Sequence, residues 1–196
     1  WGNSVSMHDH ADMWIHESFC TYAEALYIEQ LQGKEKANNY LLTQKKRIEN
    51  KSVIQGQYGV NYNLWEDADM YFKGTWMLHT IRNAYKIADS AWLCAFMRIQ
   101  NDFRYISREL HAFLDHKAPP VLEYKLSGQV LHYRWSAKNE GLAMPLTLNV
   151  GNESIYLQHV SNNWQQVNLT QAVPAKPKSS YVQIPEDRFL VTLQKL

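Results

Sequence analysis

The sequence predicts an α+β protein in two parts, a helical part over residues 1–118 and a small antiparallel β-sandwich over residues 119–196. In the first part, apolar residues recur at spacings of three and four, as they do in amphipathic helices. After Pro119 and Pro120, apolar residues alternate with polar ones, as they do in half-buried strands. The proline pair therefore marks the predicted domain boundary.

The composition is that of a chain with a packed core and no strongly electrostatic partner. Of its 196 residues, 45% are apolar, and the formal net charge is +1. We expect no nucleic-acid partner, because the chain has no dense basic patch. No apolar run approaches the length of a membrane span, so none is predicted. Cys20 and Cys94 lack the CxxC spacing, and we expect them to be free and buried.

The first predicted helix runs from about residue 12 to Leu31 and ends at Gly33, because glycine commonly terminates helices. Glu17 lies beside apolar positions of this helix, where an unpaired carboxylate is costly to bury. It is therefore either a paired core acid or a metal ligand. Glu24 follows two helical turns later, on about the same side.

A second helix is predicted over residues 35–50, with Lys45 to Arg47 on its solvated side. The segment 51–67 then loses the helical period. A loop of this length in a compact domain is often functional. An ordered surface loop around a packed Tyr58 explains the segment equally well.

A third helix is predicted from about Asp69 to Ala88. Asp69 is a candidate N-cap, because its carboxylate can accept hydrogen bonds from the first amides of the helix. Gly74 would allow close packing against a neighbouring helix. Taken alone, Tyr71 would be a core tyrosine. A further helical face is expected over residues 92–103.

The second part is predicted to begin with a hairpin. Residues 122–126 and 131–135 alternate in polarity around a two-residue turn at Ser127–Gly128. Several short strands at this spacing are typical of a β-sandwich. The other strand candidates are residues 144–150, 154–159, 165–168, 180–184 and 189–194.

Three motifs, in this order along the chain, resemble the zinc aminopeptidase family that includes membrane alanyl aminopeptidase and leukotriene hydrolase. They are the tripeptide WGN at residues 1–3, WIHES at 14–18 and YFKG at 71–74. In that family, WGN closely follows the zinc-binding HExxH motif. The family's Asn-Glu-Gly is His16-Glu17-Ser18 here, a departure that leaves the glutamate in place. The resemblance implies the α-helical C-terminal part of a thermolysin-like catalytic domain, followed by the family's β-sandwich.

The resemblance also implies roles for single residues. Glu17 would be the third ligand of one zinc ion, and Tyr71 would donate a hydrogen bond to the oxyanion of the tetrahedral intermediate. Glu24 would hold a zinc-ligating histidine, although an ion pair explains it equally well. The loop equivalent to 51–67 runs near the family's substrate cleft, whose candidate lining residues here are Gln57, Tyr58, Gly59, Val60 and Asn61.

The resemblance places HExxH upstream of Trp1. Two zinc histidines and the general-base glutamate would then come from the part of the catalytic domain just before Trp1, and upstream N-terminal domains of the same protein would be partners of this chain. We therefore expect an enzyme that removes N-terminal residues from peptide substrates, and a chain that is inactive by itself. His8 and His10 are expected to be polar surface residues.

Two other functions are open. A non-catalytic scaffold or binding protein could keep the peptidase fold without the metal site, although Glu17 and Tyr71 would then have no reason to remain. A carbohydrate- or protein-binding β-sandwich with a helical appendage would use Trp135 and Trp164. Core packing explains those tryptophans as well.

Overall fold

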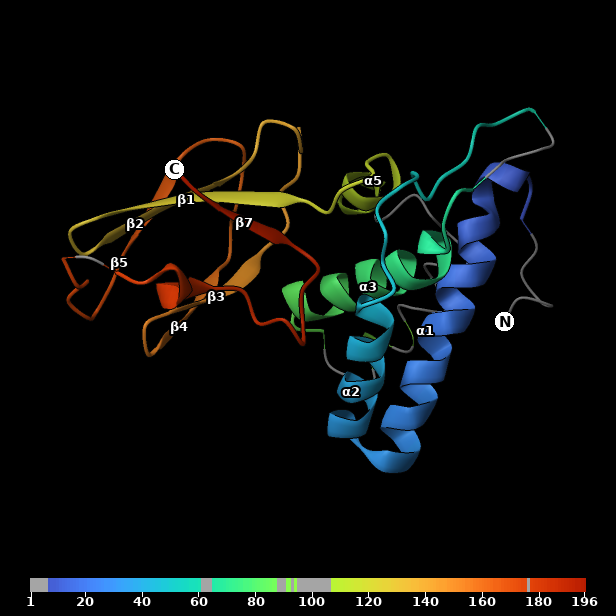
Figure 1. The fold of residues 1–196 in the computed structure, drawn as a ribbon, viewed down its shortest axis with the longest axis horizontal. Helices are drawn as coiled ribbons and strands as arrows, with labels where there is room; N and C mark the ends of the chain where they lie inside the picture. The colour runs from blue at the N-terminus through green and yellow to red at the C-terminus, as the bar shows by residue number, and fades with distance from the viewer. Residues whose placement is uncertain (1–6, 61–64, 88–90, 93, 95–106, 176) are drawn as a thin grey trace. The chain divides into compact units, whose positions relative to one another are not determined.

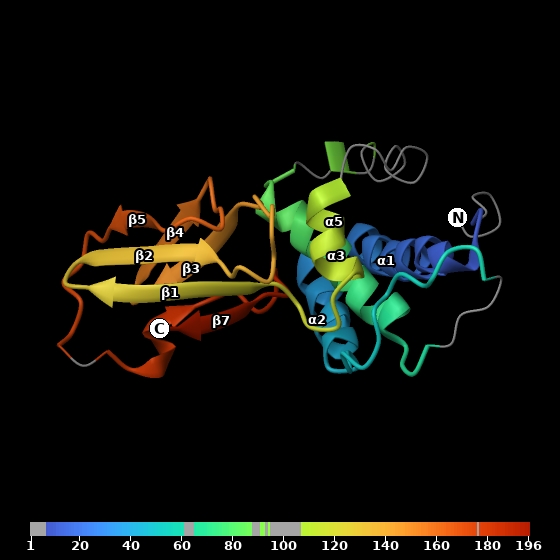
Figure 2. The same cartoon turned by 90° about the horizontal axis from the view of Figure 1, so that it is seen from above.

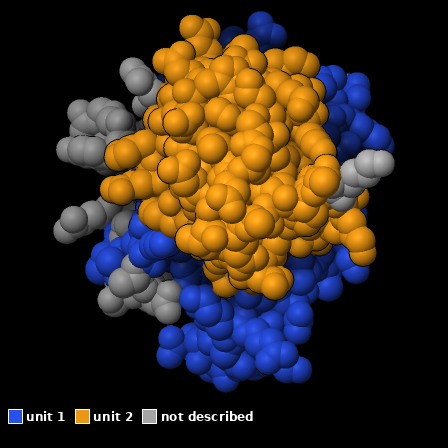
Figure 3. Space-filling view, turned by 90° about the vertical axis from the view of Figure 1, so that its left-hand side faces the viewer, with its two compact units in different colours: residues 1–118 blue, residues 119–196 orange. Residues whose placement is uncertain are grey.

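The computed structural model describes residues 7–60, 65–87, 91, 92, 94, 107–175 and 177–196. It is a mixed α+β structure, as the sequence predicted. The chain divides into two compact units, residues 1–118 and 119–196, which Figure 3 colours separately. This division coincides with the change of hydrophobic period at Pro119 and Pro120.

The first unit begins with a helical hairpin (Figure 1). One turn of 3-10 helix, η1 (His10–Asp12), leads into α1 (Met13–Gln32), and α2 (Lys34–Lys45) follows almost at once. Between them, Gly33 has a φ of 89°, and its amide donates to the carbonyl of Glu29 at 3.0 Å. Glycine reaches this φ without steric cost. The predicted helix end at Gly33 is therefore confirmed.

Helix α2 ends five residues before the predicted end, because the backbone that follows it binds two carboxylates. The amides of residues 49–50 donate to Asp69 at 2.9 and 2.7 Å, and those of residues 51–52 donate to Asp67 at 2.8 and 2.9 Å. Asp69 is buried and is the first residue of α3 rather than its N-cap. The predicted capping role is therefore wrong, because these amides take up the carboxylate.

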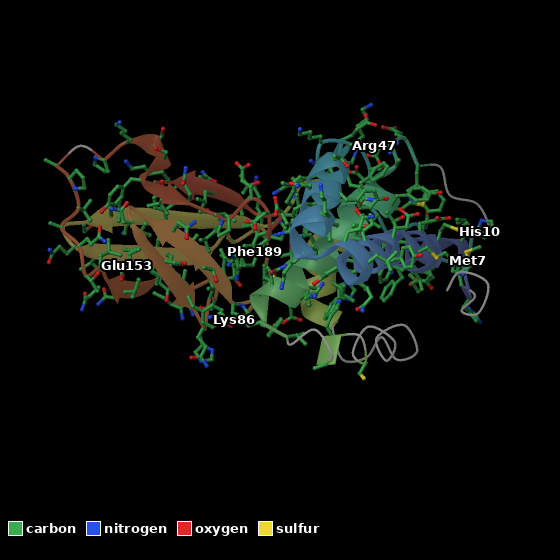
Figure 4. The ribbon with its side chains drawn as sticks, turned by 90° about the horizontal axis from the view of Figure 1, so that it is seen from below. Met7, His10, Arg47, Lys86, Glu153 and Phe189 are labelled. Carbon is green, nitrogen blue, oxygen red and sulfur yellow. The ribbon has the colours of Figure 1, made fainter. Side chains whose placement is uncertain are left out.

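The basic residues at the end of α2 are mostly solvated, as predicted, since Lys46 and Arg47 are exposed and Lys45 is partly buried. Two of them also contact aromatic rings. Lys45 Nζ lies 4.4 Å from the ring centroid of Trp76, and Arg47 Cζ lies 4.0 Å from that of Phe72. Arg47 is labelled in Figure 4. Cations over aromatic faces at these distances are attracted by the ring quadrupole. The prediction missed both contacts, because the rings belong to another helix.

Helix α3 (Asp69–Ala84) is the central helix of the first unit. Every residue from Phe72 to Arg82 is buried, which is typical of a helix that neighbours surround. Figure 1 shows it packed along α1, and helix α5 (Ser107–Leu114) also contacts it. The predicted helical face at 92–103 lies outside the described residues except for residues 92 and 94. Of these, Trp92 is buried.

The two cysteines are free, as predicted. Cys20 on α1 is partly buried and Cys94 is exposed, so the expectation that both are buried is wrong. Within the part of the chain that the structure describes, no helix is long and apolar enough to cross a membrane.

The second unit contains two β-sheets. One has the strand order β5-β2-β1-β7 and the other β4-β3-β6. Figure 2 shows the strands of the two sheets in two layers, as in a sandwich. The strands are β1 (Val121–Ser127), β2 (Val130–Trp135), β3 (Leu146–Val150), β4 (Glu153–Leu157), β5 (Gln165–Asn168), β6 (Val182–Gln183) and β7 (Thr192–Lys195).

Two details of the predicted sandwich need correction. The pairing is antiparallel except between β1 and β7, which run parallel. The first hairpin turns at Gly128–Gln129, one residue later than predicted, because Ser127 still pairs with Val130. Gly128 has a φ of 59°, which a two-residue hairpin turn requires at its first position.

The two candidate ligand-binding tryptophans have different surroundings. Trp135 is fully buried, and its indole N–H donates to the carbonyl of Met144 at 3.2 Å. Trp164 is exposed, with Lys125 Nζ 4.7 Å and Arg134 Cζ 4.6 Å from its ring centroid. Core packing therefore explains Trp135 but not Trp164. Glu153, labelled in Figure 4, lies on β4 and accepts a hydrogen bond from the Thr170 hydroxyl at 3.0 Å.

Candidate functional site

Helices α1 and α3 bring together the two residues on which the predicted chemistry depends. Glu17 on α1 and Tyr71 on α3 are both partly buried, and the Glu17 carboxylate lies close enough to the Tyr71 phenol to act on it electrostatically. Burial, and then the negative charge of Glu17, raise the pKa of Tyr71 above its ordinary value. Tyr71 is therefore a protonated hydrogen-bond donor at neutral pH.

The helices approach each other closely beside this pair. Ser18 is fully buried, and its hydroxyl donates to the carbonyl of Met70 at 2.7 Å. A Cβ atom added to Gly74 would lie only 1.8 Å from the Ser18 Oγ. The predicted role of Gly74 in close helix packing is therefore confirmed. The contact places the residue after Glu17 against the residue before Tyr71.

Glu17 has no compensating cation among the residues that the structure describes. Its neighbours along the helix include the buried Trp14 and Ile15. Across the described ranges, no three His, Cys, Asp or Glu side chains form a group that could hold a metal ion. Within those ranges, Glu17 therefore stands alone as the candidate metal ligand.

The nearby histidines have other surroundings. The His16 ring accepts a hydrogen bond from the Met7 amide, with Nε2 3.0 Å from the nitrogen. His10 lies in η1, and Figure 4 shows Met7 and His10 near the start of α1. His8 is exposed, as predicted. The WGN motif at residues 1–3 lies outside the described residues.

The predicted cleft loop is attached to the start of the helix that carries Glu17. The Tyr58 hydroxyl donates to Asp12 Oδ1 at 2.5 Å, and the Gly59 amide donates to Asp9 Oδ2 at 2.9 Å. Burial, and then the Asp12 carboxylate, raise the pKa of Tyr58. Hydrogen bonds rather than core packing therefore hold Tyr58, whose residue surface is 56% exposed.

Of the other four predicted lining residues, the structure describes three, and all three are exposed. Gln57, Gly59 and Val60 are exposed, and Val60 is 44% exposed despite its apolar side chain. Asn61 lies outside the described residues. A role of this loop in substrate binding stays a prediction.

Glu24 is exposed on α1 and has a partner on α2. The Tyr40 hydroxyl donates to Glu24 Oε2, and burial followed by this hydrogen bond raises the pKa of Tyr40. The partner is thus a phenol rather than the cation of an ion pair. A role for Glu24 in holding a zinc-ligating histidine stays a prediction.

A polar network at the other end of the α1–α3 contact was missed by the sequence analysis. Arg82 donates to both carboxylate oxygens of Glu29, at 2.7 and 2.9 Å. Nearby, the Tyr22 hydroxyl lies 3.2 Å from His79 Nδ1. No local pattern predicts these contacts, because they join residues more than fifty positions apart on two helices.

Lys73, within the YFKG motif, is also buried. Its ammonium donates to the carbonyls of His116 and Lys117, at 2.5 and 2.7 Å. Burial lowers the pKa of Lys73 to about 8, although the charges of Asp69 and Asp67 oppose this shift. Lys73 therefore ties α3 to the end of the first unit.

No protein-family model matches this sequence, and no curated protein matches it.

Proposed function

We propose that this chain is the C-terminal portion of a zinc-dependent aminopeptidase, which hydrolyses N-terminal residues from peptides. The first unit would be the helical part of a thermolysin-like catalytic domain, and the second unit its β-sandwich. One observation carries the proposal: α1 and α3 bring two residues from separate motifs, Glu17 and Tyr71, close enough for the Glu17 charge to raise the pKa of Tyr71. In this proposal the chain by itself is inactive.

Glu17 would be a ligand of the zinc ion. Carboxylate oxygens are among the usual ligands of catalytic zinc, and Glu17 is a partly buried carboxylate without a cation partner in the described part of the chain. The residues present therefore fit one of three protein ligands. The two histidine ligands and the general base would come from an HExxH segment directly upstream in the same catalytic domain. When bound, zinc would polarise the scissile carbonyl and activate a water molecule.

Tyr71 would donate a hydrogen bond to the oxyanion that develops from the substrate carbonyl. A preorganised neutral donor stabilises such a charge in the transition state. The raised pKa of Tyr71 keeps its phenol protonated at neutral pH, and its position beside Glu17 places it next to the candidate metal ligand. The protonated phenol would then donate to the substrate oxygen.

Zinc content and peptidase activity test the proposal together. Both would be measured for this chain and for a longer protein that contains it with an upstream HExxH segment, using an alanyl or leucyl amide as substrate. We expect zinc and hydrolysis in the longer protein and neither in this chain alone. If the longer protein has neither, the fold serves a binding or scaffolding function, and the aminopeptidase proposal is wrong.

A further inference from the structure

Trp164 is an exposed aromatic residue beside β5, the edge strand of the sheet β5-β2-β1-β7. In this sheet, Gln166 on β5 lies opposite His132 on β2. Trp164 comes two residues before Gln166, and side chains two residues apart point to the same face of a sheet. The Trp164 residue is 38% exposed. An aromatic ring therefore lies open to solvent on a face whose neighbouring side chains are polar.

Two cations from neighbouring strands contact this ring. Lys125 Nζ on β1 lies 4.7 Å from the ring centroid, and Arg134 Cζ on β2 lies 4.6 Å from it. The charge of Arg134 is compensated by Glu123, whose Oε2 accepts a hydrogen bond from the arginine Nε at 2.7 Å. Lys125 is exposed and pairs with no carboxylate within the described residues. One positive charge beside the ring therefore remains uncompensated.

Hydrogen bonds fix the loop that precedes Trp164. The side-chain amide of Asn162 donates to the carbonyls of Ser136 and Asn139, at 2.9 and 3.0 Å. Its oxygen accepts a hydrogen bond from the Gly141 amide at 3.0 Å. A group that is held in place before a ligand arrives loses little conformational entropy on binding. The exposed ring is therefore preorganised.

The composition of this face favours a carbohydrate over a protein partner. Among the described residues of the second unit, the only exposed large apolar residues are Trp164 and Leu196. A stable protein interface needs a larger apolar core. A sugar ring needs only one aromatic face, because its C–H groups carry the positive partial charge that the ring quadrupole attracts. Its hydroxyl groups can form hydrogen bonds with side chains such as Gln166 and His132.

We propose that this face, made of Lys125, His132, Arg134, Trp164 and Gln166, binds a polysaccharide of uronic acids. One sugar ring stacks on Trp164, and its carboxylate pairs with Lys125. In a uronic acid the carboxylate is attached to the sugar ring itself, so stacking brings the negative charge next to the uncompensated ammonium. Such charge-assisted hydrogen bonds are stronger than neutral ones. The inference is independent of the proposed peptidase function, because it involves neither zinc nor the first unit.

Binding of polygalacturonate to the 196-residue chain, measured by isothermal titration calorimetry, tests the proposal. Two polymers are compared with it. Methyl-esterified polygalacturonate has the same sugar rings without the charge, and poly-glutamate has carboxylates without sugar rings. We expect saturable binding of polygalacturonate and at least about fivefold weaker binding of the esterified polymer, the scale of one exposed ion pair. Poly-glutamate should bind more weakly than polygalacturonate.

Two results of this comparison would overturn the proposal. One is the absence of polygalacturonate binding. The other is equal binding of poly-glutamate, which would show that the face recognises charge alone, as in a contact with an acidic protein.

Two substitutions at residue 164 test the stacking. Trp164→Ala removes the ring, and we expect it to weaken polygalacturonate binding about tenfold. Trp164→Tyr keeps an aromatic face and should bind within about threefold of the wild type. Circular dichroism checks that both variants are folded. Wild-type affinity in Trp164→Ala, or equal losses in the two variants, would contradict stacking on this ring and overturn the proposal.

Lys125→Gln tests the charge, and it decides the question even if Trp164→Ala does not fold. It is preferred to a change at Arg134, which would leave the mostly buried Glu123 without its cation. We expect the affinity for polygalacturonate to fall about fivefold, and that for the esterified polymer to stay the same.

Lys178→Gln is the matched control for the charge. Lys178 is an exposed lysine in the segment that leads into β6, a strand of the other sheet. We expect this variant to bind polygalacturonate as the wild type does. An equal loss of affinity in Lys178→Gln, or no loss in Lys125→Gln, would overturn the proposal.

Discussion

Helix α1 carries two partly buried carboxylates that contact α3, and their partners differ. Near the C-terminal end of α1, Glu29 accepts two hydrogen bonds from the Arg82 guanidinium, at 2.7 and 2.9 Å. Near the N-terminal end, Glu17 lies close to the phenol of Tyr71, whose pKa its negative charge helps to raise. No cation pairs with Glu17 in the described segments.

This difference distinguishes an acid that stabilises the fold from one that is a candidate for function. A bidentate pair of guanidinium and carboxylate compensates both charges inside the protein. A carboxylate that no cation compensates can still bind a metal cation. We therefore assign Glu29 to the structure of the helix pair and Glu17 to the proposed metal site.

The largest effect is expected from removing Glu17 in the longer protein. Glu17→Ala should abolish zinc binding, and with it all hydrolysis, because one of three protein ligands is lost. Zinc per molecule, measured by elemental analysis after dialysis, checks this. Glu29→Gln is the control on the same helix and should keep its zinc. Stoichiometric zinc in Glu17→Ala would show that Glu17, like Glu29, is not a zinc ligand.

The free energy of unfolding should depend more on the Glu29–Arg82 pair than on Glu17, which is the reverse of the ranking expected for zinc binding. Arg82→Met leaves Glu29 partly buried without its cation, and we expect a loss of about 3 kcal/mol in the free energy of unfolding. Glu17→Gln should change that free energy by less than about 1 kcal/mol, because the Tyr71 phenol can donate to the amide oxygen. Urea unfolding of this chain, followed by helical circular dichroism, compares the two variants. Equal losses would contradict the comparison.

The phenol beside Glu17 should matter for turnover. In the longer protein, Tyr71→Phe should lower kcat by about a hundredfold, the scale of losing one oxyanion donor, which corresponds to about 2.7 kcal/mol. Zinc content should not change. Tyr40→Phe removes the phenol bound to the exposed Glu24 and should leave kcat near the wild-type value. Near-normal turnover in Tyr71→Phe would exclude Tyr71 from the mechanism.

A smaller effect is expected from the two buried cations of α3, Arg82 and Lys73. Arg82 binds a carboxylate, whereas the described hydrogen-bond partners of Lys73 are carbonyl oxygens. Because burial lowers the pKa of Lys73 to about 8, the folded chain binds this proton less tightly than the unfolded chain does. The contribution of Lys73 to the free energy of unfolding should therefore rise with pH, by on the order of 2 kcal/mol between pH 8 and pH 10.

Urea unfolding at several pH values from 7 to 10 measures this contribution. Lys73→Met should remove the rise, because its side chain does not titrate. A wild-type chain whose stability is flat or falls relative to Lys73→Met across this window would contradict the shifted pKa.

Local patterns in the sequence predicted those parts of the fold that neighbouring residues control. The glycine at residue 33 ends α1 through its own backbone freedom, and β5 has the predicted bounds of Gln165–Asn168. The α+β class follows from two hydrophobic periods, each of which is visible in a short window. The predicted end of α2 failed because Asp67 and Asp69, about twenty residues away, bind the amides that would have continued it.

The amino-acid sequence alone identified Glu17, Tyr71 and Gly74 as candidate residues, because each belongs to a short motif with a recognisable pattern. It could not show that Glu17 lies close to Tyr71, that Ser18 lies against Gly74, or that Arg82 rather than Lys73 pairs with an acid. These contacts join α1 to α3 across more than fifty residues. They depend on the angle and offset at which two helices pack, which the summed burial of the whole unit sets and which no local spacing encodes.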